Sequence, residues 1–154
     1  TESGLVLMQQ GFEFEAAVSL PGNFELTAAY SYNDAKVTES LFEPEVGLRL
    51  SDVPQHMASA WGVKTLRLNE SAALRLGAGV RYIGDTVSTG TAMTLETPSY
   101  TLVDALAAID WDRWTLAVNA TNLFDKEYFA PCRAFGDCFS GNRRYVVGSL
   151  SFRF

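Results

Sequence analysis

Cysteine and histidine, the side chains that most often bind soft metals or carry redox chemistry, are scarce in this sequence of 154 residues. The cysteines Cys132 and Cys138 have no histidine or further cysteine near them to complete a metal site. His56 is the sole histidine, which favours a structural role. There is no G-x-S-x-G nucleophile motif, and the glycines of segment 77–79 lie in an alternating run rather than between a strand and a helix. These patterns predict that the protein is not an enzyme and has no metal site or cofactor.

Alternation of apolar and polar residues covers most of the chain and predicts strands. In segment 72–88, Leu74, Leu76 and Val80 share one parity, whereas Arg75 and Arg81 share the other. Successive side chains of a strand point to opposite faces, so each such segment has one apolar and one polar face. The predicted strands are 11–20, 24–38, 53–66, 72–88, 100–111, 114–124 and 144–154.

The lengths of these strands and of their connections favour a membrane barrel. About seven strands of roughly 10 to 15 residues are predicted, against about 5 to 6 residues for a usual strand. Short turns at 21–23, 67–71 and 112–113 alternate with long loops at 39–52, 89–98 and 125–143. Short turns at one end and long loops at the other are typical of outer-membrane barrels. The predicted fold is therefore all-β, an antiparallel up-and-down transmembrane β-barrel segment.

The last predicted strand has the pattern of a barrel strand that faces lipid. Phe154, Phe152 and Leu150 share one parity, and Arg153 and Ser151 share the other. The chain finishes on an aromatic residue, whereas the ends of soluble domains tend to be polar and frayed. We interpret the apolar parity as the lipid-facing side. Aromatic residues beside the short turns, such as Trp111 and Trp114, are expected to form a girdle at the membrane interface.

The amino-acid composition argues against two further classes of protein, helical membrane proteins and nucleic-acid binders. Apolar residues make up 47% of the chain, yet no run approaches the roughly 18 apolar residues of a membrane helix. The formal net charge of -6 argues against binding to nucleic acid, which calls for a basic patch. Residues 1–4 do not resemble the start of a signal peptide, so we expect either a cleaved signal or the C-terminal part of a longer protein, and we favour the second. A soluble β-sandwich with one wet face is an alternative.

Residues 122–128 read NLFDKEY and are followed by a long loop and a terminal strand that ends in SFRF. These motifs resemble the C-terminus of TonB-dependent siderophore receptors, and more narrowly of the ferrichrome-type hydroxamate receptors. Segments 52–66 (DVPQHMASAWGVKTL) and 99–111 (SYTLVDALAAIDW) are similar to late barrel strands of that family. The resemblance covers nearly the whole chain.

The resemblance implies a barrel of about 22 strands in the bacterial outer membrane, with an N-terminal plug inside it. A ferric siderophore would bind at the outer mouth, and the TonB complex would act through N-terminal regions. The present chain contains only about seven of those strands and neither a plug nor a TonB box, so we expect it to be the C-terminal portion of such a barrel. Seven strands also leave two unpaired edges, which lipid does not tolerate.

The resemblance also implies roles for the loop at 125–143. In the hydroxamate receptors a cysteine pair occupies the last extracellular loop, which predicts a Cys132–Cys138 disulfide in an oxidising compartment. The disulfide either pre-organises a ligand-contacting loop or only protects an exposed one. Phe139, Phe135 and Tyr128 are the predicted ligand contacts, Phe139 foremost. Alternatively, Tyr128 belongs to the aromatic girdle at the membrane interface, and the two phenylalanines pack the loop on itself.

Two further expectations concern the barrel wall. Arg75 and Arg81 share the polar parity with Asp104 and Asp110 of the next strand, so ion pairs inside the lumen are expected. The resemblance makes Phe154, Phe152 and Leu150 the signal that the barrel assembly machinery recognises. A small complete outer-membrane barrel of about eight strands, in which residues 1–10 supply the extra strand, is the alternative to a receptor segment.

Overall fold

The computed structural model describes residues 5–41, 46–90 and 93–154. Within these ranges every regular element is a β-strand. The described part of the chain has no helix long and apolar enough to cross a membrane. The predictions for segments 1–10, 39–52 and 89–98 partly concern residues 1–4, 42–45 and 91–92, which lie outside the described residues.

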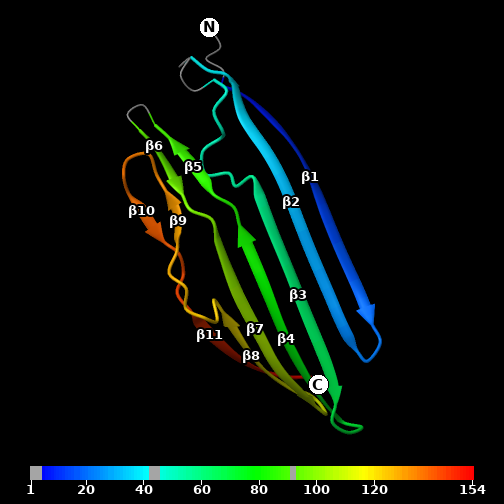
Figure 1. The fold of residues 1–154 in the computed structure, drawn as a ribbon. Coiled ribbons are helices and arrows are strands. Elements are labelled where there is room, and N and C mark those ends of the chain that lie inside the picture. The colour runs from blue at the N-terminus through cyan, green and yellow to red at the C-terminus, as the bar shows by residue number, and fades with distance from the viewer. Residues whose placement is uncertain (1–4, 42–45, 91–92) are drawn as a thin grey trace.

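Seven long strands form one antiparallel sheet in which successive long strands are neighbours (Figure 1). The predicted up-and-down all-β segment is therefore confirmed, with a strand in each of the seven predicted segments. The strands are β1 (Val6–Leu20), β2 (Phe24–Glu39), β3 (His56–Arg67), β4 (Ala72–Ile83), β7 (Tyr100–Trp111), β8 (Trp114–Thr121) and β11 (Tyr145–Phe152).

The three short turns lie at one end of the sheet, as predicted (Figure 1). The tightest turn joins β7 to β8, because Trp111 and Trp114 are direct partners and leave only two residues between them. Asp112, the first of these two, has a φ of 52°, which a two-residue hairpin turn requires and aspartate tolerates. The long connections consequently gather at the opposite end.

Two small hairpins occupy the loop end and were not predicted. Strands β5 (Thr86–Thr89) and β6 (Thr94–Thr97) form one, and β9 (Phe129–Cys132) and β10 (Cys138–Ser140) form the other. The prediction of one strand over 72–88 was wrong, because the ladder between β3 and β4 ends at Ile83. A Cβ atom at Gly84 would lie 2.9 Å from the carbonyl oxygen of His56, so the backbones approach closely there before the chain leaves the sheet.

Other strand boundaries also differ from the prediction. β1 begins at Val6 rather than at residue 11, since pairing with β2 continues where the alternation is weak. β3 begins at His56 rather than at residue 53. β8 ends at Thr121, three residues early, because Asn122 turns the backbone with a φ of 52°. β11 covers Tyr145–Phe152, so Phe154 lies beyond the strand rather than in it.

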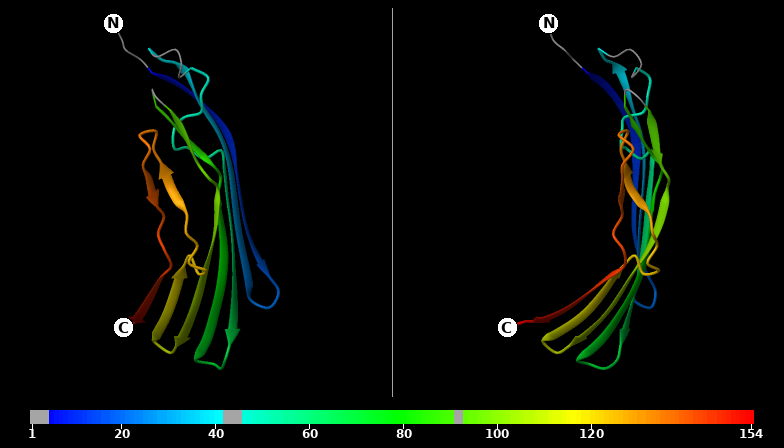
Figure 2. Two further views of the ribbon diagram at one scale, coloured as in Figure 1. Left: turned by 60° about the vertical axis from the view of Figure 1, so that its left-hand side comes forward. Right: turned by 90° about the vertical axis from the view of Figure 1, so that its left-hand side faces the viewer.

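The long strands place their two parities on opposite faces of a curved sheet (Figure 2). We call the face that carries Arg75, Arg81, Asp104 and Asp110 the inner face, and the other the outer face. Trp61 also belongs to the inner face, where its indole lies over Gly79 of the neighbouring strand. Tryptophan and glycine thus interlock within the polar face.

The outer face is predominantly apolar and open. Large apolar side chains along it are exposed, among them Leu116, Leu150 and Phe154. Few apolar residues of the described chain are buried, namely Ala35, Val37, Leu102, Ala108 and Cys132. A continuous apolar face of this size marks a surface that meets lipid or another protein rather than water.

Candidate ligand-binding site

Asn122 closes the base of the long loop after β8. Its side chain is buried at 2% exposure. The Nδ2 group donates to the carbonyl oxygens of Lys126 (2.8 Å) and Asn142 (3.1 Å), and Oδ1 accepts from the amide of Lys126 (2.9 Å). The amide of Asn122 donates to Asp104 Oδ1 (2.9 Å), which joins the turn to the inner face of β7. One side chain therefore joins the two ends of the loop.

Asp125 makes the second closure of the same loop. Its carboxylate accepts from Arg143 Nε at 3.0 Å, from Arg143 Nη2 at 2.7 Å and from the Arg144 amide at 2.8 Å. The Arg143 hydrogen bonds, followed by that of the Arg144 amide, hold the pKa of Asp125 far below its usual range. Glu127 is a second carboxylate partner of Arg143. The motif at 122–128 thus fixes the loop to the start of β11.

The predicted disulfide between Cys132 and Cys138 is present and joins β9 to β10. We call β9, β10 and the segment between them the disulfide hairpin. Inside the covalent ring that the disulfide closes, Arg133 is paired with Asp137, and Arg133 Nε lies 3.0 Å from Asp137 Oδ2. This hydrogen bond lowers the pKa of the Asp137 carboxyl. The ring is therefore closed both covalently and by a charge pair.

The three predicted ligand contacts lie in different places. Phe139 is 47% exposed, and the Arg133 guanidinium lies 4.8 Å from the centroid of its ring. Phe135 is 90% exposed at the far end of the hairpin. Tyr128 packs instead on Tyr100, with 4.2 Å between the ring centroids. Whether any of them contacts a ligand stays a prediction.

Tyr100 is a candidate that sequence reasoning missed. Its partner in the ladder is Ile83, so it belongs to the inner face, like Arg81. Together with Tyr128 it lines a cavity of about 450 Å³ at the base of the disulfide hairpin. Lys126, Glu127 and Arg143 add charges to the lining. An aromatic pocket with a charged rim suits a bulky polar chelate. Tyr100 alternates in phase with the polar residues of β7, and this pattern could have identified it from the sequence as an inner-face residue.

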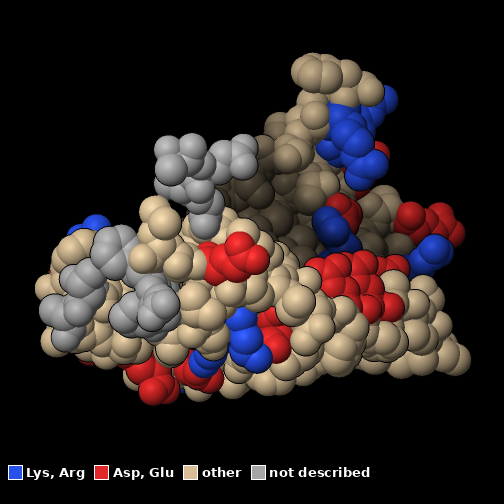
Figure 3. Space-filling model, turned by 90° about the horizontal axis from the view of Figure 1, so that it is seen from above, with Lys and Arg blue, Asp and Glu red and all other residues tan. Residues whose placement is uncertain are grey.

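Ion pairs cross the inner face as predicted. Arg75 Nε lies 2.8 Å from Asp110 Oδ2, and Arg81 Nε lies 2.6 Å from Asp104 Oδ2. Thr115 Oγ1 donates to Asp110 at 2.7 Å. Viewed from the loop end, basic and acidic groups line the hollow of the sheet (Figure 3). The inner face is therefore a hydrated or protein-facing surface rather than a lipid-facing one.

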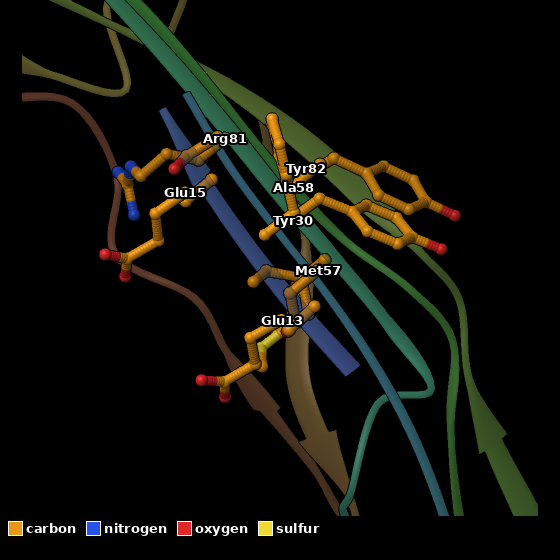
Figure 4. A pocket seen from close by; sticks show the side chains of 12 residues that line it. Glu13, Glu15, Tyr30, Met57, Ala58, Arg81 and Tyr82 are labelled. Atoms are coloured by element: carbon orange, nitrogen blue, oxygen red, sulfur yellow. The ribbon is translucent and has the colours of Figure 1, made fainter. Parts of the chain in front are cut away.

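A shallow depression of about 280 Å³ extends the polar inner face toward β1. Figure 4 shows Glu13, Glu15 and Arg81 extending to one side of the sheet, whereas Tyr30 and Tyr82 extend to the other. The outer-face Tyr30 hydroxyl lies 2.8 Å from Nδ1 of His56, so the lone histidine has a hydrogen-bond partner. The depression carries charge but has no deep enclosure.

The predicted terminal assembly residues lie at the turn end of β11. Phe152 pairs with Trp114, with 4.7 Å between ring centroids, and Leu150 pairs with Leu116. Phe154 is fully exposed and meets Phe152 edge-on at 5.4 Å. The aromatic cluster predicted beside the short turns is therefore present. Recognition of these residues by an assembly machinery stays a prediction.

Long antiparallel strands, one apolar face and polar loops at one end define an outer-membrane barrel wall. The family model "TonB dependent receptor-like, beta-barrel" matches residues 9–123. The chain belongs to this family of TonB-dependent receptors, and its place is the bacterial outer membrane.

The curated relatives are named as transporters and receptors. The chain is 36% identical over 151 residues to the "Ferrichrome outer membrane transporter/phage receptor" of Escherichia coli, which covers 94% of the chain and 20% of that protein. It is 35% identical over 150 residues to the "Ferrioxamine B receptor" of Salmonella typhimurium, covering 94% of the chain and 21% of the relative. The chain thus spans about a fifth of the length of these relatives.

Solved structures share the fold. The ferric preacinetobactin receptor BauA from Acinetobacter baumannii superposes with a TM-score of 0.80 at 20% identity, over 94% of this chain and 22% of that one. The ferric-catecholate import receptor Fiu from E. coli gives a TM-score of 0.77 at 21% identity, over 96% and 21% of the two chains. The seven-stranded sheet is therefore a segment of the receptor barrel fold.

Proposed function

We propose that this chain is the C-terminal barrel segment of an outer-membrane receptor that imports ferric siderophores of the hydroxamate class. The observation that carries the proposal is the identity of 36% and 35%, each over 94% of the chain, to receptors named for ferrichrome and ferrioxamine B. Both ligands are ferric hydroxamates, and iron is the cargo here rather than a resident cofactor.

In this proposal the segment has a passive mechanical role. The outer face contacts lipid, and the inner face, with its Arg75–Asp110 and Arg81–Asp104 pairs, faces the plug domain. The TonB complex acts through N-terminal regions beyond these residues, and β11 is recognised by the barrel assembly machinery. The disulfide hairpin and the cavity beside Tyr128 form part of the ligand mouth.

The test is uptake of iron-55 by cells that express the complete receptor in a strain without its own hydroxamate receptors. We expect uptake from iron-55 ferrichrome or ferrioxamine B, abolished when tonB is deleted. A ferric catecholate serves as the control ligand and should give no uptake above background. Uptake of the catecholate alone would contradict the hydroxamate assignment, and uptake without TonB would contradict the transport mechanism.

A further inference from the structure

Side-chain hydroxyls, rather than a shared sheet, fasten the disulfide hairpin to its neighbour. The β5–β6 hairpin and the disulfide hairpin belong to separate sheets, although β9 lies beside β6 (Figure 1). The Thr97 hydroxyl oxygen accepts from the amide of Cys132 at 2.7 Å. Thr97 is 4% and Cys132 is 3% exposed, so this bond is shielded from water. A buried amide left without its acceptor is costly, which makes Thr97 a strong anchor.

Ser88 supplies a second anchor within the disulfide ring. Its hydroxyl oxygen accepts from the amide of Ala134 at 3.1 Å, and the serine is 7% exposed. Gly90 allows this contact, because a Cβ atom there would lie 2.8 Å from the Cβ of Ala134. The two hydroxyls therefore hold the backbone of the hairpin at positions 132 and 134.

The β5–β6 hairpin is itself anchored to the segment before β3. The amide of Thr89 donates to the Ser51 hydroxyl at 3.0 Å. Arg49 Nη1 lies 2.7 Å from Asp85 Oδ2, and its Nη2 donates to the Asp85 carbonyl oxygen at 2.9 Å. The Arg49 hydrogen bond lowers the pKa of Asp85, which keeps this carboxylate charged. The hairpin is thus a fixed base against which the disulfide hairpin is oriented.

We propose that Thr97 and Ser88 are positioning residues that orient the disulfide hairpin over the mouth and thereby set the affinity for a ferric hydroxamate. Neither residue is a predicted ligand contact. The disulfide closes the hairpin on itself but does not fix its direction relative to the sheet. A hairpin that is already oriented costs the ligand less ordering free energy on binding. This inference rests on the proposed function.

The test uses the complete receptor in detergent and four variants. Thr97→Val and Ser88→Ala remove a hydroxyl, Thr97→Ser keeps it, and Thr94→Val is the matched control at an exposed position of the same hairpin. Two quantities are measured: hydrogen exchange of the Cys132 and Ala134 amides without ligand, and the dissociation constants of ferrichrome and ferrioxamine B. Exchange at these two amides reports directly whether their hydrogen bonds to the hydroxyls of Thr97 and Ser88 are formed.

We expect Thr97→Val to speed exchange of the Cys132 amide and to weaken binding by about three- to tenfold. Ser88→Ala should act likewise at Ala134, Thr97→Ser should restore wild-type values, and Thr94→Val should change neither quantity. Unchanged exchange in Thr97→Val overturns the anchoring, and faster exchange with affinity within about twofold of wild type overturns the effect on ligand. If wild-type receptor binds neither chelate, the proposed function fails, while the exchange data still decide the anchoring.

Discussion

At the scale of single residues, the motif at 122–128 works mainly through the side chains of Asn122 and Asp125. Asn122 has a positive φ, which asparagine tolerates, and its amide spans both ends of the loop. Asp125 has the same backbone conformation and accepts hydrogen bonds from Arg143 and Arg144. The pattern of residue types is therefore explained by loop closure, independently of any ligand.

The closure by Asn122 can be measured at one amide. Asn122→Ala removes the acceptor of the Lys126 amide, and we expect the free energy of local opening at that amide to fall by about 1 to 3 kcal/mol. Hydrogen exchange of the receptor in detergent gives this quantity. Asn142→Ala is the control, because its backbone carbonyl is what accepts from Asn122. Equal protection of Lys126 in both variants would show that the Asn122 side chain does not hold the loop.

The closure by Asp125 predicts a dependence on pH. Its folded-state pKa is lowered, so its contribution to stability is present above the unfolded pKa of about 3.9 and is lost as the pH falls through the lowered value. Protection of the Arg144 amide, corrected for intrinsic exchange, should therefore be constant from pH 7 to about 4 and decrease in more acidic buffer.

Asp125→Asn isolates this carboxylate. The variant should show weaker protection of the Arg144 amide at neutral pH and little further loss in acid, because the titrating group is absent. Glu127→Gln is the control, since that side chain is 78% exposed and does not bind the amide. Two results together would contradict the role of Asp125: protection of the Arg144 amide in the wild type that does not fall in acid, and full protection of the same amide in Asp125→Asn.

At the scale of elements, the alternation of apolar and polar residues predicted the long strands, because each of them has an apolar outer face and a polar inner face. Where both faces are wet or covered by loops, the alternation carries less information. The strand predicted over 72–88 therefore ran past Gly84 into β5, and β6 and the β9–β10 hairpin were predicted as loops. The partnership of Tyr128 with Tyr100 could not be predicted either, because it depends on how a loop folds back over β7.

The disulfide hairpin is the element whose stability is simplest to alter. Replacing both Cys132 and Cys138 by serine opens a short ring, and the loss of chain constraint is about 2 kcal/mol. We expect faster tryptic cleavage after Arg133, with unchanged amounts of receptor in the outer membrane. The wild-type receptor treated with a reductant is the control for the substitutions themselves.

The same variant separates the two roles of the disulfide. Weaker binding of ferrichrome in the double serine variant would favour a pre-organised ligand loop, whereas unchanged binding with faster cleavage would favour protection alone. Unchanged cleavage together with unchanged binding would contradict both roles, because the ring would then add nothing to the order of the hairpin.

Interlocking of Trp61 with Gly79 is a second property of the elements. A Cβ atom at position 79 would collide with the indole, so Gly79→Ala must displace the ring or the strand. We expect it to destabilise the barrel by roughly 1 to 3 kcal/mol, measured as a lower midpoint of unfolding in detergent. Gly148→Ala is the matched control, since among the described residues no atom lies within 4 Å of a Cβ atom at that position. Equal midpoints would show that the indole is free to move.

At the scale of the whole molecule, the sheet has two open edges. β1 pairs only with β2, and β11 pairs only with β8, so each has a row of backbone groups without a partner in the described sheet. Unpaired backbone groups are costly in lipid, and an open sheet edge does not occur there. The outer face is nevertheless apolar as far as both edges, with Phe12 and Phe14 on β1 and Leu150 on β11 exposed. Further strands must therefore pair with both edges in the membrane.

This geometry predicts how the 154-residue chain behaves when it is expressed alone and refolded in detergent. As a segment of a larger barrel it should not give the heat-modifiable band of a closed barrel on a gel, and it should aggregate through β1 and β11. The complete receptor, refolded in the same way, is the control and should give such a band. A heat-modifiable monomer of the isolated chain would instead support the alternative of a small complete barrel of about eight strands. The transport proposal would then have to be withdrawn, because a closed barrel of that size has its interior filled by side chains.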